Sequence, residues 1–66
     1  MKTWKIDYSV CSMDGEVEER EATIKADDIA QAVVLAHANI VDVLNQDPKV
    51  LDTVIWGVVI IDDNPF

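Results

Sequence analysis

The sequence predicts a small α+β fold, a two-layer ββαβ sandwich in which one helix packs on one face of a three-stranded antiparallel sheet. Residues 3–12 and 16–25 flank an Asp-Gly turn, and the first of these segments alternates apolar and polar side chains, as a half-buried strand does. Residues 28–45 repeat apolar side chains at helical spacing, and residues 54–61 form an apolar run rich in β-branched residues. We therefore expect a single domain, residues 1–66, with the order strand, strand, helix, strand.

The hairpin register follows from which residues must share the buried face. A two-residue loop of residues 14–15 would place the apolar residues of the two strands on opposite faces. A three-residue loop of residues 13–15 instead places Trp4 opposite Ile24 and keeps the apolar residues together. We therefore expect the longer loop, with Gly15 in a left-handed conformation.

The second strand is expected to be an acidic edge strand. Residues 16–21 read Glu-Val-Glu-Glu-Arg-Glu, and the predicted register puts two of these glutamates near Asp7 on the face away from the helix. One interpretation is a docking surface for the Arg and Lys side chains of a basic protein, with a charge that imitates a nucleic-acid backbone. The alternative is a solvated edge whose charge prevents aggregation. The residues predicted to bind the partner are Asp7, Glu16, Glu18, Glu19 and Glu21.

The helix is expected over residues 28–45. Asp28 and Gln31 have the spacing of a capping box, and Pro48 stops the helix because the residue before a proline avoids the α region. A helix between the second and third strands makes a crossover that leaves these two strands parallel. Placing the last strand beyond the first is the simplest arrangement, so the predicted strand order is 2-1-3.

The last strand would then be an exposed edge with apolar side chains on both faces. Either Gly57 faces the helix and Trp56 points outward, or Trp56 is buried and the opposite face is exposed. Both arrangements leave an apolar patch uncovered, which predicts a homodimer formed by pairing of the last strands or by packing of the open sheet faces. The alternative is a monomer with a more complete core. The residues predicted at the dimer interface are Ile55, Trp56, Val58, Val59 and Ile61.

Composition narrows the class of partner. The chain carries thirteen acidic and five basic residues, which gives a net charge of −8. This charge disfavours direct contact with nucleic acid or with anionic membranes, and it favours a basic protein partner. A single cysteine excludes an internal disulfide, and the N-terminus lacks the apolar stretch of a signal peptide. We therefore expect a cytoplasmic protein.

No combination of residues in the sequence predicts catalysis. Cys11 and His37 could form a nucleophile and its base, but the predicted fold places Cys11 on the open face and the helix on the other. The acidic residues lack the spacing of a calcium loop, and one cysteine with one histidine does not form a typical zinc site. We expect no metal, no cofactor and no enzymatic activity.

The favoured hypothesis is a small, non-enzymatic, homodimeric interaction protein. Its acidic hairpin would dock a basic protein, for example a nucleic-acid-binding protein, and inhibit it. Small acidic chains of this kind are common among phage and mobile-element products, so an inhibitor of that type is part of the hypothesis. One alternative is a structural or assembly protein that uses its apolar edge strand. A further alternative is a small-ligand binder or enzyme with a pocket at an interface.

Overall fold

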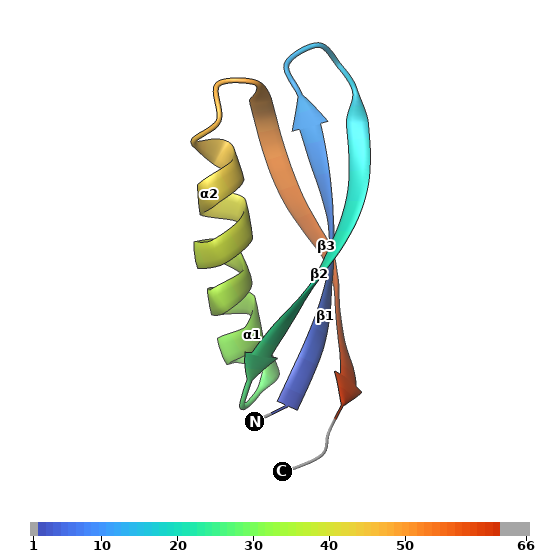
Figure 1. Cartoon of the computed structure of the whole chain (residues 1–66), viewed down its shortest axis with the longest axis vertical. Coiled ribbons are helices and arrows are strands. Elements are labelled where there is room, and N and C mark those ends of the chain that lie inside the picture. The colour runs from blue at the N-terminus through green and yellow to red at the C-terminus, as the bar shows by residue number, and fades with distance from the viewer. Residues whose placement is uncertain (1, 63–66) are drawn as a thin grey trace.

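A twisted three-stranded sheet and one helical layer make up the structure (Figure 1). The computed structural model of the chain describes residues 2–62. Its elements are β1 (Lys2–Ser12), β2 (Val17–Ala26), α1 (Ile29–Ala36), the π-helical segment η1 (His37–Val41), α2 (Asp42–Asn45) and β3 (Val50–Asp62). The molecule is elongated, with principal extents of 43 × 17 × 15 Å, because the strands run along its long axis.

β1 is the central strand of the sheet. It pairs antiparallel with β2 on one side and with β3 on the other, so the strand order is β2-β1-β3. β2 and β3 therefore run parallel to each other, and the helical layer connects them across one face of the sheet (Figure 1). The predicted α+β fold, with strand order 2-1-3 and one helix on one face, is confirmed.

The hairpin adopts the predicted register. Trp4 pairs with Ile24, as the buried face requires. The backbone amide of Ser12 donates to the carbonyl of Glu16 at 2.8 Å, so the loop contains three residues. Gly15 has a φ of +92°, in the left-handed region that favours glycine. The two-residue loop is therefore excluded.

A capping arrangement begins the helix at Ile29. The Asp28 carboxylate accepts a hydrogen bond from the backbone amide of Gln31 at 2.8 Å, and the Gln31 side-chain oxygen accepts one from the backbone amide of Asp27 at 2.6 Å. The second bond reaches one residue further back than in the usual capping box. Together the two bonds satisfy backbone donors that have no partner inside the helix.

The middle of the helix widens into the π-helical turn η1. The Asn39 side-chain amide donates to the carbonyl of Leu35 at 2.8 Å, an acceptor that α-helical bonding would assign to the Asn39 backbone amide. The last two residues of this turn, Ile40 and Val41, are both buried.

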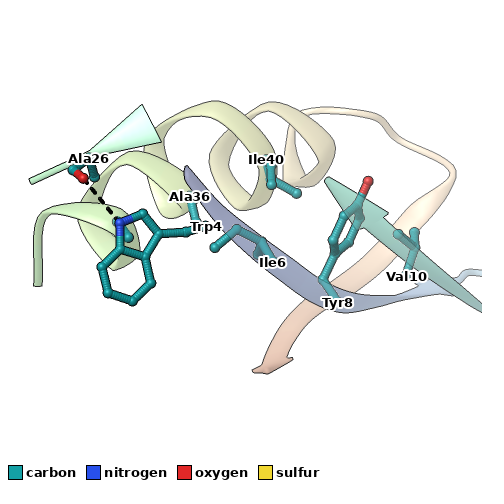
Figure 2. Close-up of a cluster of buried hydrophobic side chains, with 8 residues drawn as sticks. Trp4, Ile6, Tyr8, Val10, Ala26, Ala36 and Ile40 are labelled. Carbon is teal, nitrogen blue, oxygen red and sulfur yellow. Dashed lines mark hydrogen bonds between the residues drawn. The ribbon is translucent and has the colours of Figure 1, made fainter. Parts of the chain in front are cut away.

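The core lies between one face of β1 and the helix. Every second residue of β1 from Trp4 to Val10 is buried, as expected for a strand with one face against a partner. The helix meets this face mainly with small alanine side chains, which allow its backbone to come close to the sheet. Figure 2 shows most of the cluster, whose buried members are Trp4, Ile6, Tyr8, Val10, Ala26, Ala32, Ala36 and Ile40.

Trp4 also connects the core to the end of β2. Its indole Nε1 donates a hydrogen bond to the carbonyl of Ala26 at 3.1 Å (Figure 2). A buried N–H group without an acceptor costs about 1–3 kcal/mol. The bond therefore allows a large ring with one polar atom to lie inside the core.

β3 contains three residues that have no partner on β1. Its pairing skips Leu51, Trp56 and Ile61, and each marks a bulge-type irregularity in the antiparallel ladder. The strand also begins at Val50, before the apolar run in which it was expected to start. Because bulges bend a strand and increase its twist, β3 follows β1 along a coiled path.

The irregularity at Trp56 decides which side chains of β3 face the helix. Ile55 pairs with Tyr8 and Val58 pairs with Ile6, so residues on both sides of the extra residue face the core. The two arrangements predicted for this strand both assume one uninterrupted alternation. Trp56 points outward, as the first arrangement predicted, but Gly57 faces away from the helix as well, so neither arrangement holds for the whole strand. The reason is that one inserted residue moves the following side chains to the opposite face.

Thr53 is the buried polar exception in β3. It is 5% exposed, and within residues 2–62 its hydroxyl oxygen has no hydrogen-bond partner. A buried polar group without a partner lowers stability by about 1–3 kcal/mol.

We predict that Thr53→Val stabilises the protein, because a methyl group replaces the unpartnered hydroxyl at similar size. Urea denaturation should show the free energy of unfolding rise by about 1 kcal/mol. Thr23→Val, at an exposed position of β2, is the matched control and should change stability by less than about 0.5 kcal/mol. A loss of stability in Thr53→Val would contradict the prediction.

Candidate functional site

The sheet face opposite the helix, called the open face below, carries a group of acidic side chains. Asp7 pairs with Glu21, and Ser9 pairs with Glu19. Directly opposed residues of an antiparallel pair point to the same face, so the carboxylates of Asp7, Glu19 and Glu21 gather there. Like charges in such positions repel each other, so a bound cation would relieve the repulsion.

Asp7 is the least exposed carboxylate of this group, with a side chain that is 15% exposed. It pairs with Gly57 of β3. A Cβ atom at Gly57 would lie 2.9 Å from Asp7 Oδ2 and 3.2 Å from Asp7 Cβ. The absence of a side chain at Gly57 therefore provides the space that the Asp7 carboxylate occupies.

Lys5 lies beside two of the carboxylates. Its Nζ atom is 3.9 Å from Asp7 Oδ1 and 4.0 Å from Glu21 Oε2. Both distances are long for an ion pair, and the Lys5 side chain is 39% exposed, so each contact is weak. Two carboxylates thus share one ammonium group, and within residues 2–62 Glu19 forms no ion pair.

Glu18 lies on the other side of β2, paired with Val10. Arg20 donates to it through two hydrogen bonds of 3.0 Å, from Nε to Oε1 and from Nη2 to Oε2. These bonds and the attraction to the guanidinium lower the pKa of Glu18, and the same contact raises the pKa of Arg20. The pKa of Glu18 is lower in the folded protein than in the unfolded chain. The ion pair therefore stabilises the fold at pH values above the ordinary glutamate pKa, and this stabilisation is lost as the pH falls through the lowered pKa.

Glu16 lies beside the hairpin turn, where its backbone amide donates to the Asp14 carboxylate at 3.1 Å. The five acidic residues predicted to bind a partner therefore do not form one group. The structure brings Asp7, Glu19 and Glu21 together on the open face, and it leaves Glu16 and Glu18 outside.

Trp56 lies next to the three gathered carboxylates. It is 59% exposed and lines a shallow surface pocket together with these carboxylates and Arg20. As the inserted residue of a bulge, it points to the same face as Gly57. We call the group Asp7, Glu19, Glu21 and Trp56 the acid–tryptophan site.

Sequence reasoning identified the carboxylates of this site and missed the indole beside them. The sequence places Trp56 only in the predicted dimer interface, because strict alternation along the strand does not reveal a bulge. An isolated glycine within a strand is the available signal, since it often marks a bulge or a close approach. Gly57 carries that signal here.

The residues predicted at the dimer interface divide between core and surface. Ile55 and Val58 pack against the core, and the other three are exposed. Val54, which is 48% exposed and pairs with Ser9 on the open face, joins the exposed group. We call the exposed apolar side chains of β3 on the open face the apolar strip, which consists of Val54, Trp56, Val59 and Ile61.

Cys11 and His37 lie in different layers. Cys11 is half-buried on the open face of β1, and His37 is exposed at the start of η1. Among the side chains that the structure describes, those of residues 2–61, no three His, Cys, Asp or Glu are placed to hold a metal ion together. In the same part of the chain, no helix has both the length and the apolar character needed to cross a membrane.

Comparisons of the chain with protein-family models, with curated proteins and with solved structures gave no match. Inference about function therefore rests on the residues and on their placement.

We predict that Gly57→Ala destabilises the protein by about 1–2 kcal/mol, because the new methyl group would overlap the Asp7 side chain. Urea denaturation of wild type, Gly57→Ala, Asp7→Ala and the double variant forms a complete cycle. Asp7→Ala removes the closest contact, so Gly57→Ala should cost less in that background. An equal cost in both backgrounds would show that the Asp7 carboxylate does not limit residue size at this position.

Proposed function

We propose that this protein is a non-enzymatic interaction protein that binds a basic segment of another protein at the acid–tryptophan site. The observation that supports this most directly is the meeting of three carboxylates from two strands with an exposed indole on the open face. Lys5 neutralises them only in part, through contacts of 3.9 and 4.0 Å. The site therefore combines uncompensated negative charge with an aromatic surface.

Arginine is the side chain that fits this combination best. A guanidinium group can stack on the indole of Trp56 while it donates hydrogen bonds to a carboxylate. Glu21 is accessible to such a donor, with a side chain that is 70% exposed, and Glu19 is exposed beside it. Asp7 is more enclosed and would contribute mainly through its charge. Lysine would gain the charge attraction but would lack the planar stacking contact.

A protein segment suits the site better than an enclosed small molecule does. The pocket beside Trp56 is shallow, whereas small-ligand sites usually bury most of the ligand surface. The net charge of −8 also draws basic surfaces toward the protein over a longer range and speeds their association. A basic segment that normally contacts nucleic-acid phosphates would be masked while bound here, so binding would inhibit such a partner.

We predict that a short peptide of alternating arginine and glycine binds the wild-type protein, and that binding weakens as salt rises. Glu19→Gln combined with Glu21→Gln should lower its affinity about tenfold, because two exposed charge contacts are lost. Fluorescence anisotropy of the labelled peptide measures both effects. The corresponding lysine peptide should bind more weakly than the arginine peptide to the wild-type protein.

The matched control is Glu16→Gln combined with Asp42→Asn. Each double variant removes two negative charges from −8 and leaves −6, so the overall charge is the same. Glu16 lies by the turn and Asp42 is exposed on the helix, both outside the acid–tryptophan site. Equal weakening of peptide binding in the two double variants would overturn the assignment of binding to the acid–tryptophan site, because it would show that only the overall charge matters. Absence of peptide binding at low salt would overturn the proposed function itself.

A further inference from the structure

The core of this protein is too small for its apolar content. Within residues 2–62, Ile6 is the one large side chain that is fully buried. Eleven large hydrophobic residues are at least 38% exposed, and six of them belong to β3. Small domains of this size often complete their core by association. β3 is therefore where a covering surface is needed most.

Four of these six side chains of β3, those of the apolar strip, share the open face. Val54 and Val59 pair with Ser9 and Lys5, both on the open face. Ile61 lines a surface pocket with Lys5 and Thr23 on the same face. Without the extra residue at Trp56, side chains five residues apart would lie on opposite faces. The bulge therefore creates the apolar strip as a continuous surface.

Charge indicates where two copies of this chain can meet. Residues 53–61 contain no charged side chain, in a chain whose net charge is −8. Contact between copies through the acidic hairpin would bring carboxylates close to carboxylates, which is unfavourable. A second copy can cover the apolar strip without that penalty. A second copy is also present whenever the chain itself is present, which suits a surface that stability requires to be covered.

We propose that two copies of this chain pack their apolar strips against each other to form a homodimer. This inference does not depend on the proposed function. The two-fold axis that relates the copies could have three directions. It could be perpendicular to the sheet, parallel to the sheet and across the strands, or parallel to β3. The features of β3 and of the open face select among these three.

The axis perpendicular to the sheet would pair the two β3 edges. Bulges are one of the features that block such pairing, and β3 has three irregularities, at Leu51, Trp56 and Ile61. They leave regular stretches of only four residues, 52–55 and 57–60, between them. A continuous sheet through two β3 edges would be interrupted at each of these points.

The axis across the strands would lay one whole open face on the other. Each β2 would then cover the β2 of its partner, and Glu19 and Glu21 would be buried against the same residues of the other copy. The axis along β3 brings only the two apolar strips into contact. The two acidic edges then point to opposite sides of the dimer and stay in solvent, with Trp56 at the border between the two surfaces.

The first test is the oligomeric state of two charge variants. Sedimentation of the wild-type protein at low micromolar concentration should give twice the 7.4 kDa mass of the chain. Val59→Glu, within the apolar strip, should shift the protein to monomer by weakening association at least tenfold. Val34→Glu, at a 66% exposed position of α1, is the matched control and should remain dimeric. A monomeric wild type, or a Val59→Glu variant that stays dimeric, would overturn the proposal.

The second test does not depend on whether Val59→Glu folds. In a Cys11→Ser background, Val54→Cys and Val59→Cys are each treated with a homobifunctional maleimide that spans about 10 Å, the usual distance between packed sheets. With the axis along β3, each residue faces its own copy, so both variants should cross-link. With either of the other two axes the strands run in opposite directions. Positions five residues apart, about 16 Å, then cannot both lie near the axis. Cross-linking at one position only, or at neither, would overturn the proposed arrangement.

Discussion

The packing of β1 against the alanine-rich side of the helix is the contact on which the rest of the structure depends. Within residues 2–62, β1 is the strand with a neighbour on each side, and its inner face supplies Trp4, Ile6, Tyr8 and Val10 to the core. A helix is about 10 Å wide and strands lie about 4.8 Å apart, so one helix covers only about two strands. The acid–tryptophan site and the apolar strip both lie on surface that this single helix leaves uncovered.

The open face is divided between charge and apolar surface. Carboxylates gather where β2 lies beside β1, and the apolar strip follows β3 at the other edge. These two surfaces suit different partners, because carboxylates favour cations and the apolar strip favours an uncharged surface. In the proposed homodimer, this division would let the chain associate with itself through β3 while its charge stays available along β2. Trp56 stands at the border and belongs to both surfaces.

One inserted residue in β3 links these features. The irregularity at Trp56 puts Gly57 opposite Asp7, which gives the carboxylate its space, and it brings the indole to the acidic group. It also moves Val59 to the face that Val54 occupies. The strict alternation assumed from the sequence predicts neither the meeting of Trp56 with the acidic group nor the shared face of Val54 and Val59. An inserted residue leaves the local pattern of apolar side chains intact and changes only the face to which they point.

Local patterns in the sequence determined the elements and the three-residue hairpin loop, and the crossover rule then predicted the strand order. Each depends on short-range chemistry: alternation in β1, the Asp-Gly turn, the cap at Asp28 and the one register that keeps Trp4 opposite Ile24. Tertiary structure alone decided which acidic residues gather, which side chains of β3 reach the core, and that Trp56 lies beside Asp7. These outcomes depend on how β3 aligns with β1 along its whole length. That alignment joins two strands far apart in the sequence, so no local pattern specifies it.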